Sequence, residues 1–533
     1  MKHVLHETRT AVDGASTRVD AGLTGRARRS TTSLLLTNGA WNATSTVVSG
    51  VLAFLLVPLL LNRLGELTYG VWILIGSMFA YSTILQFGLS SAINRHVPVA
   101  LAKGNDDDIR RVVSTATVFF AGVGLVVALA TVVLRWNLPR WFHVPASLVP
   151  AAADGVVVVG FLLSVTVVAQ TFGAVLTGYQ RYDLSAISRI VMVLLRGSVL
   201  WFVLARGAGL LAVAWIYGLT ELGVNLLQYT FGVRLMPPRV VAVAAFDRTL
   251  LREMVAYGGN TFLYSAGAVL AYKASEVIIG VLRSPEEVAR YSVAAAGVLT
   301  LSAVIESLSA AIKPAVSDLD ARDLGHTIRE LSLVSQKFAL LVILPSTTFL
   351  VLMGGDFLRL WTGLARPDVA QAMALIAVGQ AFRLTQQSNF LVLVGKGEHR
   401  FFGLSVLMVG AATVVTTLLA VGVFHLGLVG AAGAGCLSWV VVSGIVIPAH
   451  VNARLGIPRA ERRRRVLLPA IAGCMPALLL TGVWKWQHAP RSWPEVILVV
   501  VVVAGVTALG AWRFTLEPKE RDRLRALAMK MRR

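Results

Sequence analysis

Three stretches of the sequence place ionisable side chains inside long apolar runs. "AYKASEVIIG" holds Lys273 and Glu276, "VMVLLRGSVLWF" holds Arg196, and "VGQAFRLTQQSNF" holds Arg383. A guanidinium in such a place can bind a phosphate through two parallel hydrogen bonds. A carboxylate there can bind a coupling cation or proton, or it can neutralise a basic neighbour. Ionisable groups at these positions are therefore the first candidates for function.

The composition indicates a membrane protein. Of 533 residues, 56% are hydrophobic and only 14% are charged, with a mean hydropathy of +0.72. Ordinary soluble domains are about 45–50% apolar and about 25% charged. The net charge of +21 comes from basic residues that lie between the apolar runs. This arrangement is typical of membrane topology signals rather than of a nucleic-acid-binding surface.

The apolar runs predict an all-α polytopic protein, because a helix needs about 20 apolar residues to cross the hydrocarbon core. We expect fourteen spans: Thr37–Leu61, Tyr69–Ile93, Val112–Leu134, Gly155–Leu176, Ile187–Leu204, Leu210–Phe231, Val255–Leu282, Val288–Ile312, Leu333–Met353, Val369–Val394, Leu404–Val423, Leu428–Pro448, Val466–Trp484 and Val496–Trp512. The fifth span is short, and it and the last two are the weakest of the set.

Basic residues set the expected orientation. Arg110 and Arg111, the run Arg462 to Arg465, and the segment from Lys519 to Arg533 all fall on one side of the predicted spans. Cytoplasmic loops carry the excess of Lys and Arg in membrane proteins. We therefore predict that both termini lie in the cytoplasm.

The chain also repeats itself. "YGVWILIGSMFAYSTILQFGLSSAI" from Tyr69 is similar to "YSVAAAGVLTLSAVIESLSAAI" from Tyr291. Six spans precede the second copy, so both halves enter the membrane in the same direction, and parallel repeats place a substrate path between two lobes. The predicted layout is a tail at 1–33, an N-lobe at 34–236, a linker at 237–253, a C-lobe at 254–450, a basic loop with two further helices at 451–515, and a basic tail at 516–533.

Particular motifs resemble a known family. The region Val57–Ala116 contains Pro58, an "LG…YG.W" turn and "FGLSSAI.R", and "SEVIIG" with "EEVARYSVA" follows in the second half. These resemble the polysaccharide transporters (O-antigen or lipid-linked oligosaccharide flippases) of the multidrug/oligosaccharidyl-lipid/polysaccharide exporter superfamily. The family commonly has aspartate where this chain has Glu276.

The resemblance implies two six-helix lobes with two extra C-terminal helices, in the bacterial cytoplasmic (inner) membrane. It also implies alternating-access transport of undecaprenyl-pyrophosphate-linked oligosaccharide repeat units for O-antigen, capsule or exopolysaccharide. Such a protein needs no cofactor and no metal, and it is not an enzyme. The implied partners are the lipid-linked substrate, membrane lipids, a coupling H⁺ or Na⁺, and the polysaccharide polymerase or ligase machinery, but no nucleic acid.

An anionic, lipid-linked sugar needs a water-filled, positively charged path through the membrane, and the candidate site residues are chosen for that path. The cations proposed for the pyrophosphate are Arg196, Lys273 and Arg383, with Arg95 and Lys313 at equivalent helix ends in the two repeats; the amides proposed for the sugars are Gln380, Gln386, Gln387 and Asn389. The alternative is structural pairing: the arginines with Glu221 or Glu306, and Lys273 with Glu276, three residues away on the same helix face. The same three carboxylates are candidates for ion coupling.

Other functions remain open on the sequence alone. A lipid II flippase shares the pyrophosphate-prenyl handle. A cation-coupled multidrug exporter of the same fold uses a carboxylate in its first span, and Thr37–Leu61 contains none. A membrane glycosyltransferase or polymerase is less well supported, because the chain shows no acidic pair, nucleophile–base set or ATP-binding glycine loop.

Overall fold

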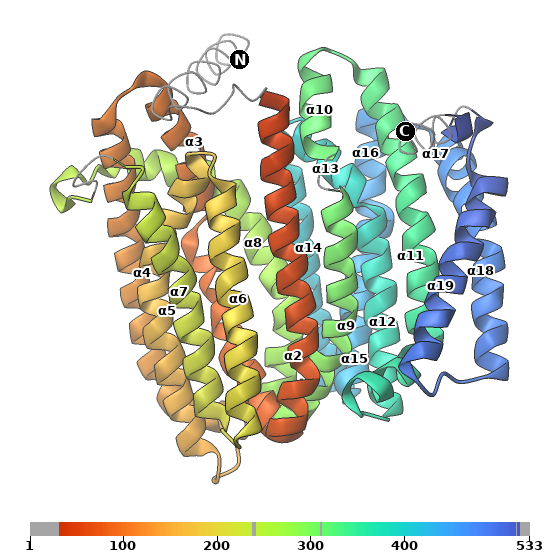
Figure 1. The fold of residues 1–533 in the computed structure, drawn as a ribbon, viewed down its shortest axis with the longest axis horizontal. Coiled ribbons are helices and arrows are strands. Elements are labelled where there is room, and N and C mark those ends of the chain that lie inside the picture. Colours follow the sequence, from red (N-terminus) through yellow and green to blue (C-terminus); the bar gives the residue numbers. More distant parts are fainter. Residues whose placement is uncertain (1–30, 237–240, 310–311, 519, 523–533) are drawn as a thin grey trace. The chain divides into compact units, whose positions relative to one another are not determined.

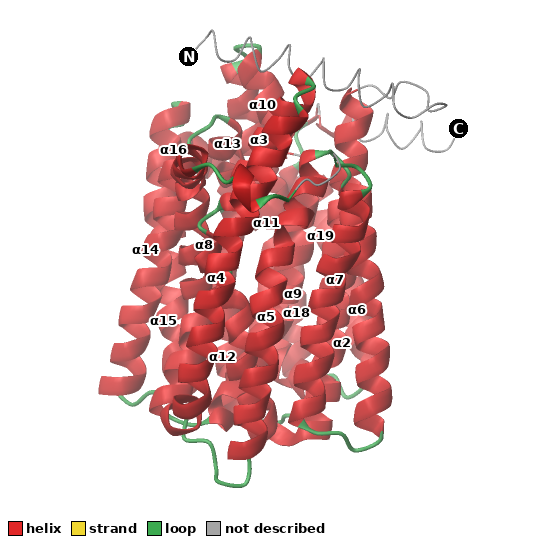
Figure 2. Cartoon of the chain, turned by 90° about the vertical axis from the view of Figure 1, so that its left-hand side faces the viewer, coloured by secondary structure: helices red, strands yellow, loops and turns green. Residues whose placement is uncertain are grey.

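The computed structural model describes residues 31–236, 241–309, 312–518 and 520–522. Within these ranges the chain is helical, with short connections and no strand (Figure 2). The helices form two compact units, Met1–Ala289 and Arg290–Arg533, and the boundary falls inside one helix, α9 (Pro285–Ser309). The expected all-α membrane fold is confirmed.

The first unit contains seven α-helices among its described residues and is coloured from red to green in Figure 1. They are α2 (Thr31–Ser82), α3 (Leu89–Lys103), α4 (Asp106–Trp141), α5 (Val149–Gly178), α6 (Tyr182–Ala205), α7 (Leu210–Val233) and α8 (Arg248–Leu282), with 3₁₀ turns η1 (Ile84–Gln86) and η2 (Val243–Ala245). Helix α5 packs against both α4 and α7, while α6 packs against α2 and α7.

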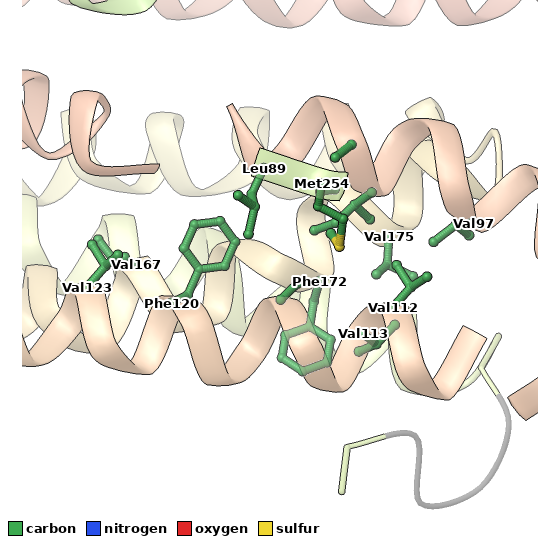
Figure 3. Close-up of a cluster of buried hydrophobic side chains, with 14 of the residues drawn as sticks. Leu89, Val97, Val112, Val113, Phe120, Val123, Val167, Phe172, Val175 and Met254 are labelled. Atoms are coloured by element: carbon green, nitrogen blue, oxygen red, sulfur yellow. The ribbon is translucent and has the colours of Figure 1, made fainter. Parts of the chain in front are cut away.

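A cluster of buried apolar side chains holds α3, α4, α5 and α8 together (Figure 3). Leu89 of α3, Phe120 of α4, Val175 of α5 and Met254 of α8 are each fully buried in it. Helix α8 is therefore fixed to the first unit by its N-terminal half.

The second unit continues from α9 to the C-terminal helices. It contains α10 (Ile312–Ala321), α11 (Gly325–Thr362), α12 (Pro367–Thr385), α13 (Gln387–Gly395), α14 (His399–Thr417), α15 (Gly427–Val441), α16 (Ile447–Leu455), α17 (Arg459–Arg462), α18 (Leu468–Gln487) and α19 (Trp493–Gly510), with π-helical segments η3 (Leu418–Val423), η4 (Val442–Val446), η5 (Arg463–Leu467) and η6 (Ala511–Thr515). Helix α11 packs against α12 and α18, and α12 packs against α15.

Among the described residues, 11 helices are long and apolar enough to cross a membrane. The difference from the fourteen predicted spans has three sources. Helix α2 carries the first predicted span and the first half of the second, with a kink at Gly65, where φ is 78° and ψ is 162°. The eighth and tenth predicted spans correspond to α9 and to the pair α12–α13, which are not among the eleven.

The prediction of one continuous helix over Tyr69–Ile93 was wrong. The chain turns at Phe87 and Gly88, which have φ values of 49° and 68°. Gly88 also lies against α8, where an added Cβ would come within 2.3 Å of the Gly258 carbonyl oxygen. The positive φ and this close backbone approach both favour glycine, and together they break the span.

The tenth predicted span is also interrupted. Helix α12 ends at Thr385 and α13 starts at Gln387, with Gln386 between them at φ −94° and ψ −2°. The polar residues that made this span unusual are therefore grouped at a helix break. Broken helices in membranes occur where the freed backbone groups are buried in protein or face water.

The unit boundary at Ala289 assigns α8 to the first unit, whereas the predicted C-lobe starts at 254. Helix α8 already begins at Arg248, so the predicted linker at 237–253 is shorter than expected. Residues 1–30 of the predicted N-terminal tail and 523–533 of the basic C-terminal tail lie outside the described residues. The repeat-based lobes remain a prediction.

Candidate functional site

In the first unit, Arg196 of α6 is bound by three residues of α7. Its guanidinium donates from NH2 to Glu221 Oε1 at 2.6 Å and from Nε to Thr220 Oγ1 at 2.8 Å, and it lies 4.6 Å from the centre of the Tyr217 ring. Tyr217, Thr220 and Glu221 share one face of α7 because they are three and four residues apart. Only 11% of the Arg196 side chain is exposed, against 34% of Glu221.

In the second unit, Arg383 has a similar set of partners. Its guanidinium forms an ion pair with Glu306 of α9, and its Nε donates to Gln380 Oε1 at 2.6 Å. The Trp439 ring of α15 lies 5.7 Å from the guanidinium carbon. As in the first unit, the arginine is more buried than the carboxylate. Each unit therefore holds a guanidinium between a carboxylate, a neutral oxygen and an aromatic ring.

Lys273 and Glu276 of α8 form the predicted i, i+3 pair. The Lys273 ammonium donates to both carboxylate oxygens of Glu276 at 2.9 Å. Glu276 is only 3% exposed, whereas Lys273 is 33% exposed. Because an unpaired charge in such surroundings is costly, the lysine neutralises the buried glutamate.

The amides around the α12–α13 break form a buried network with α11. Asn389 donates from Nδ2 to Gln386 Oε1 at 2.7 Å, and its Oδ1 accepts hydrogen bonds from Ser332 Oγ, at 2.9 Å, and from Gln336 Nε2. Gln386 and Asn389 are buried, while Gln387 is half-buried. Of the four predicted sugar-binding amides, two thus bond within the protein here, and Gln380 bonds Arg383.

The two predicted cations at helix ends have different outcomes. Arg95 is an exposed residue of α3, and its guanidinium lies 4.5 Å from the Tyr257 ring of α8. This contact accounts for its position without a substrate. Lys313 belongs to α10, but its side chain lies outside the described residues.

Sequence reasoning missed a buried cation in α11. Lys337 is 3% exposed, and its Nζ donates to both carboxylate oxygens of Glu520, at 2.8 and 2.7 Å. The available signal was a lysine just inside the predicted span Leu333–Met353. Its partner could not be found in the same way, because Glu520 lies in the segment that follows the last helix.

A further charged contact involves Asp247, the residue that precedes α8. The Arg111 guanidinium beside Asp247, together with the backbone N–H groups of Leu250 and Thr249, holds the pKa of the Asp247 carboxyl below its usual range. Asp247 accepts from Thr249 N at 2.8 Å and from Leu250 N at 3.1 Å, as an N-cap residue does. Arg111 of α4 is thereby joined to the N-terminus of α8.

None of the described residues forms a group of three or more His, Cys, Asp or Glu side chains suited to a metal ion. What the site residues can do is bind anions and exchange charge partners. Arg196 has five N–H donors, of which two are used by Glu221 and Thr220. A phosphate can therefore bind the remaining donors or replace the carboxylate.

Comparison with known proteins gives consistent matches along the chain. Residues 35–320, more than half of the sequence, match the family described as "Polysaccharide biosynthesis protein". The uncharacterized membrane protein EpsK of Bacillus subtilis is 21% identical over 496 residues, which are 91% of this chain and 96% of EpsK. The uncharacterized membrane protein MJ1068 of Methanocaldococcus jannaschii is 20% identical over 413 residues, or 74% of this chain and 79% of that protein.

Solved structures show the fold. The lipid II flippase MurJ in an inward closed conformation has a TM-score of 0.67 at 10% identity, over 88% of this chain and 98% of that one. An inward-facing multidrug resistance MATE family transporter of the MOP superfamily has a TM-score of 0.57 at 15% identity, over 79% of this chain and 94% of that one. The chain is thus a multi-pass membrane protein with the helical fold of these transporters, and it belongs to the polysaccharide biosynthesis protein family.

Proposed function

We propose that this protein is a flippase that moves undecaprenyl-pyrophosphate-linked oligosaccharide repeat units across the bacterial inner membrane by alternating access. The product would supply O-antigen, capsule or exopolysaccharide synthesis. No covalent chemistry is needed, so the proposal is a transporter and not an enzyme. The family match and the fold of the similar structures support the general class.

The observation that carries the proposal is the pair of buried arginines, one in each compact unit. Arg196 and Arg383 lie in α6 and α12, and each is held by a carboxylate that is more exposed than the arginine itself. An arginine at the bilayer centre costs about 2.5–3.5 kcal/mol on insertion scales. A pyrophosphate can take the place of Glu221 or Glu306, because guanidinium binds phosphate and carboxylate with the same geometry.

The same exchange suggests how transport is coupled. A carboxylate displaced from its arginine is left without its counter-charge, and a coupling H⁺ or Na⁺ can take the place of the arginine. Cation binding by Glu221 or Glu306 would then favour the substrate-bound state, and its release would restore the ion pair. Glu276 is less suited to this role, since its partner Lys273 is on the same helix only three residues away.

The glycan half of the substrate needs groups that donate and accept hydrogen bonds. Gln387 is half-buried at the start of α13, and Gln380 lies beside Arg383. Amides donate hydrogen bonds to sugar hydroxyls and also accept hydrogen bonds from them. We assign Gln386 and Asn389 a structural role, because the hydrogen bond between them and the bond from Asn389 to α11 stabilise the helix break.

The proposal is tested by deleting the gene and following radiolabelled lipid-linked repeat units in spheroplasts. We expect repeat units to accumulate where a membrane-impermeant glycan-oxidising reagent cannot reach them, with loss of surface polysaccharide. Arrest of peptidoglycan synthesis with normal surface polysaccharide would instead indicate a lipid II flippase. Normal peptidoglycan synthesis together with normal surface polysaccharide would refute a flippase role.

A further inference from the structure

The second unit contains an open groove of about 620 Å³ among α12, the end of α14 with η3, and α15. This volume lies within the range of about 300–1,000 Å³ typical of ligand sites. Large apolar side chains, including Leu419, Phe424 and Leu437, line it and are each roughly half exposed or more. The groove plays no part in the site described above.

Small residues create the groove. Gly430, Gly433 and Ala434 of α15 all line it, so this stretch of the helix presents little side-chain volume there. Thr416, the lining hydroxyl, donates to its own helix at Ala412 O, 2.7 Å away. With that hydroxyl satisfied, the surface between the helices is predominantly apolar.

The length of the groove matches one leaflet of a bilayer. It reaches from Leu426, beside the turn that joins η3 to α15, to Leu437, ten residues beyond the first residue of α15 at Gly427. At 1.5 Å per residue this is about 15 Å, or half of a hydrocarbon core of about 30 Å.

The lining also indicates the charge of a ligand that the groove could bind. None of the described residues that line the groove is charged. Its amide, Gln371, lies one turn from the start of α12 at Pro367, at the same end as the η3–α15 turn. A pyrophosphate would need a cation there, whereas an ester-linked chain entering from a headgroup region needs only a neutral hydrogen-bonding group.

We propose that this groove binds one acyl chain of a membrane phospholipid, from the leaflet on the side of the η3–α15 turn. The apolar lining, the single-leaflet length and the neutral mouth all fit such a chain. A long polyprenyl pyrophosphate fits less well, since it exceeds one leaflet and carries a strong negative charge. The site is independent of the flippase function, because its lining from Thr416 to Leu437 belongs to two membrane-length helices and their connection, whatever the protein transports.

Two glycines of α15 allow a matched test. A Cβ added to Gly433 would meet only Leu375 Cδ1, at an ordinary 3.9 Å, so Gly433→Leu places a side chain in the groove from a Cβ that meets no backbone atom. Gly435 is two residues along the same helix, does not line the groove, and would have nothing within 4 Å of an added Cβ. Both changes also raise helix propensity by the same amount.

The full-length protein and both variants are purified in detergent, stripped of lipid, and melted with increasing dioleoylphosphatidylglycerol or with undecaprenyl phosphate. A ligand that binds the folded state raises the melting temperature. We expect the phospholipid to raise it in the wild type and in Gly435→Leu, and the increase to be lost in Gly433→Leu. Equal increases in all three proteins, or stabilisation by undecaprenyl phosphate alone, would overturn the proposal.

Discussion

The guanidinium of Arg196 reaches from α6 to the Glu221 carboxylate of α7 at 2.6 Å, yet the carboxylate is about three times as exposed as the arginine. The acidic partner is therefore the one that an incoming polar ligand meets first. If the pair is only structural, removing either charge has the same kind of effect. If Glu221 occupies the position of the substrate anion, removing the charge of Glu221 and removing that of Arg196 change substrate binding in opposite directions.

We predict that Glu221→Gln tightens apparent substrate binding and slows turnover. The amide retains a hydrogen-bond acceptor for Arg196 but no longer competes as an anion. Arg196→Ala should weaken binding instead. Concentration dependence of flipping for both variants checks this, and a loss of binding in both would assign the pair a purely structural role.

The Lys273–Glu276 pair predicts unequal effects of its two partners. Lys273→Ala leaves Glu276 buried without a counter-charge, and breaking a buried pair in this way costs about 3–5 kcal/mol. Glu276→Ala leaves a lysine that is one-third exposed, so it should cost clearly less.

The stability of both variants is measured by thermal unfolding and by their abundance in the membrane, and the double alanine variant serves as the control. Recovery of stability in the double variant, together with normal transport, means a structural pair. Recovery of stability without transport means that Lys273 also serves the substrate. A larger loss from Glu276→Ala than from Lys273→Ala would contradict the burial argument.

The crossing of α3 and α8 at Gly88 and Gly258 should tolerate no side chain. A Cβ on Gly258 would come 2.5 Å from the Phe87 carbonyl oxygen, whereas one on the adjacent Gly259 would have nothing within 4 Å. Gly258→Ala should therefore lower the melting temperature by several degrees, and Gly259→Ala should not. Similar melting temperatures for the two variants would show that the helices separate without cost.

The Asp247–Arg111 contact predicts a pH-dependent stability difference. The folded-state pKa of Asp247 is depressed, so its contribution is present above the unfolded-state pKa of about 3.9 and is lost as pH falls through the folded value. Asp247→Asn keeps a good N-cap and removes only the charge. The variant should melt below the wild type at pH 7, and the gap should narrow as the pH falls below the unfolded-state pKa and through the lower folded-state pKa of Asp247. A constant gap would assign the effect to the cap.

Local spacing in the sequence predicted the parts of the site that lie within one helix. The i, i+3 positions of Lys273 and Glu276 were sufficient to predict their pair. Glu221 and Glu306 were recognised as partners for Arg196 and Arg383, but not which belonged to which. The contact between α9 and α12 that joins Glu306 to Arg383 is separated by 77 positions along the chain.

Hydropathy predicted where helices occur but not where they break. An apolar window averages over residues 87 and 88, although their positive φ values end the helix. The backbone contact of Gly88 with Gly258 that stabilises this turn is a tertiary feature. Lys337 was missed for the same reason, because Glu520 is 183 positions away.

The most direct test of the account is flipping of a purified undecaprenyl-pyrophosphate oligosaccharide in proteoliposomes. Wild type is compared with Arg196→Ala, Arg383→Ala and a control, Arg206→Ala. Arg206 is exposed at the end of α6, beside Phe202. We predict that the two buried-site variants insert normally but lose transport, and that Arg206→Ala retains it. Wild-type flipping rates in both buried-site variants would contradict the account.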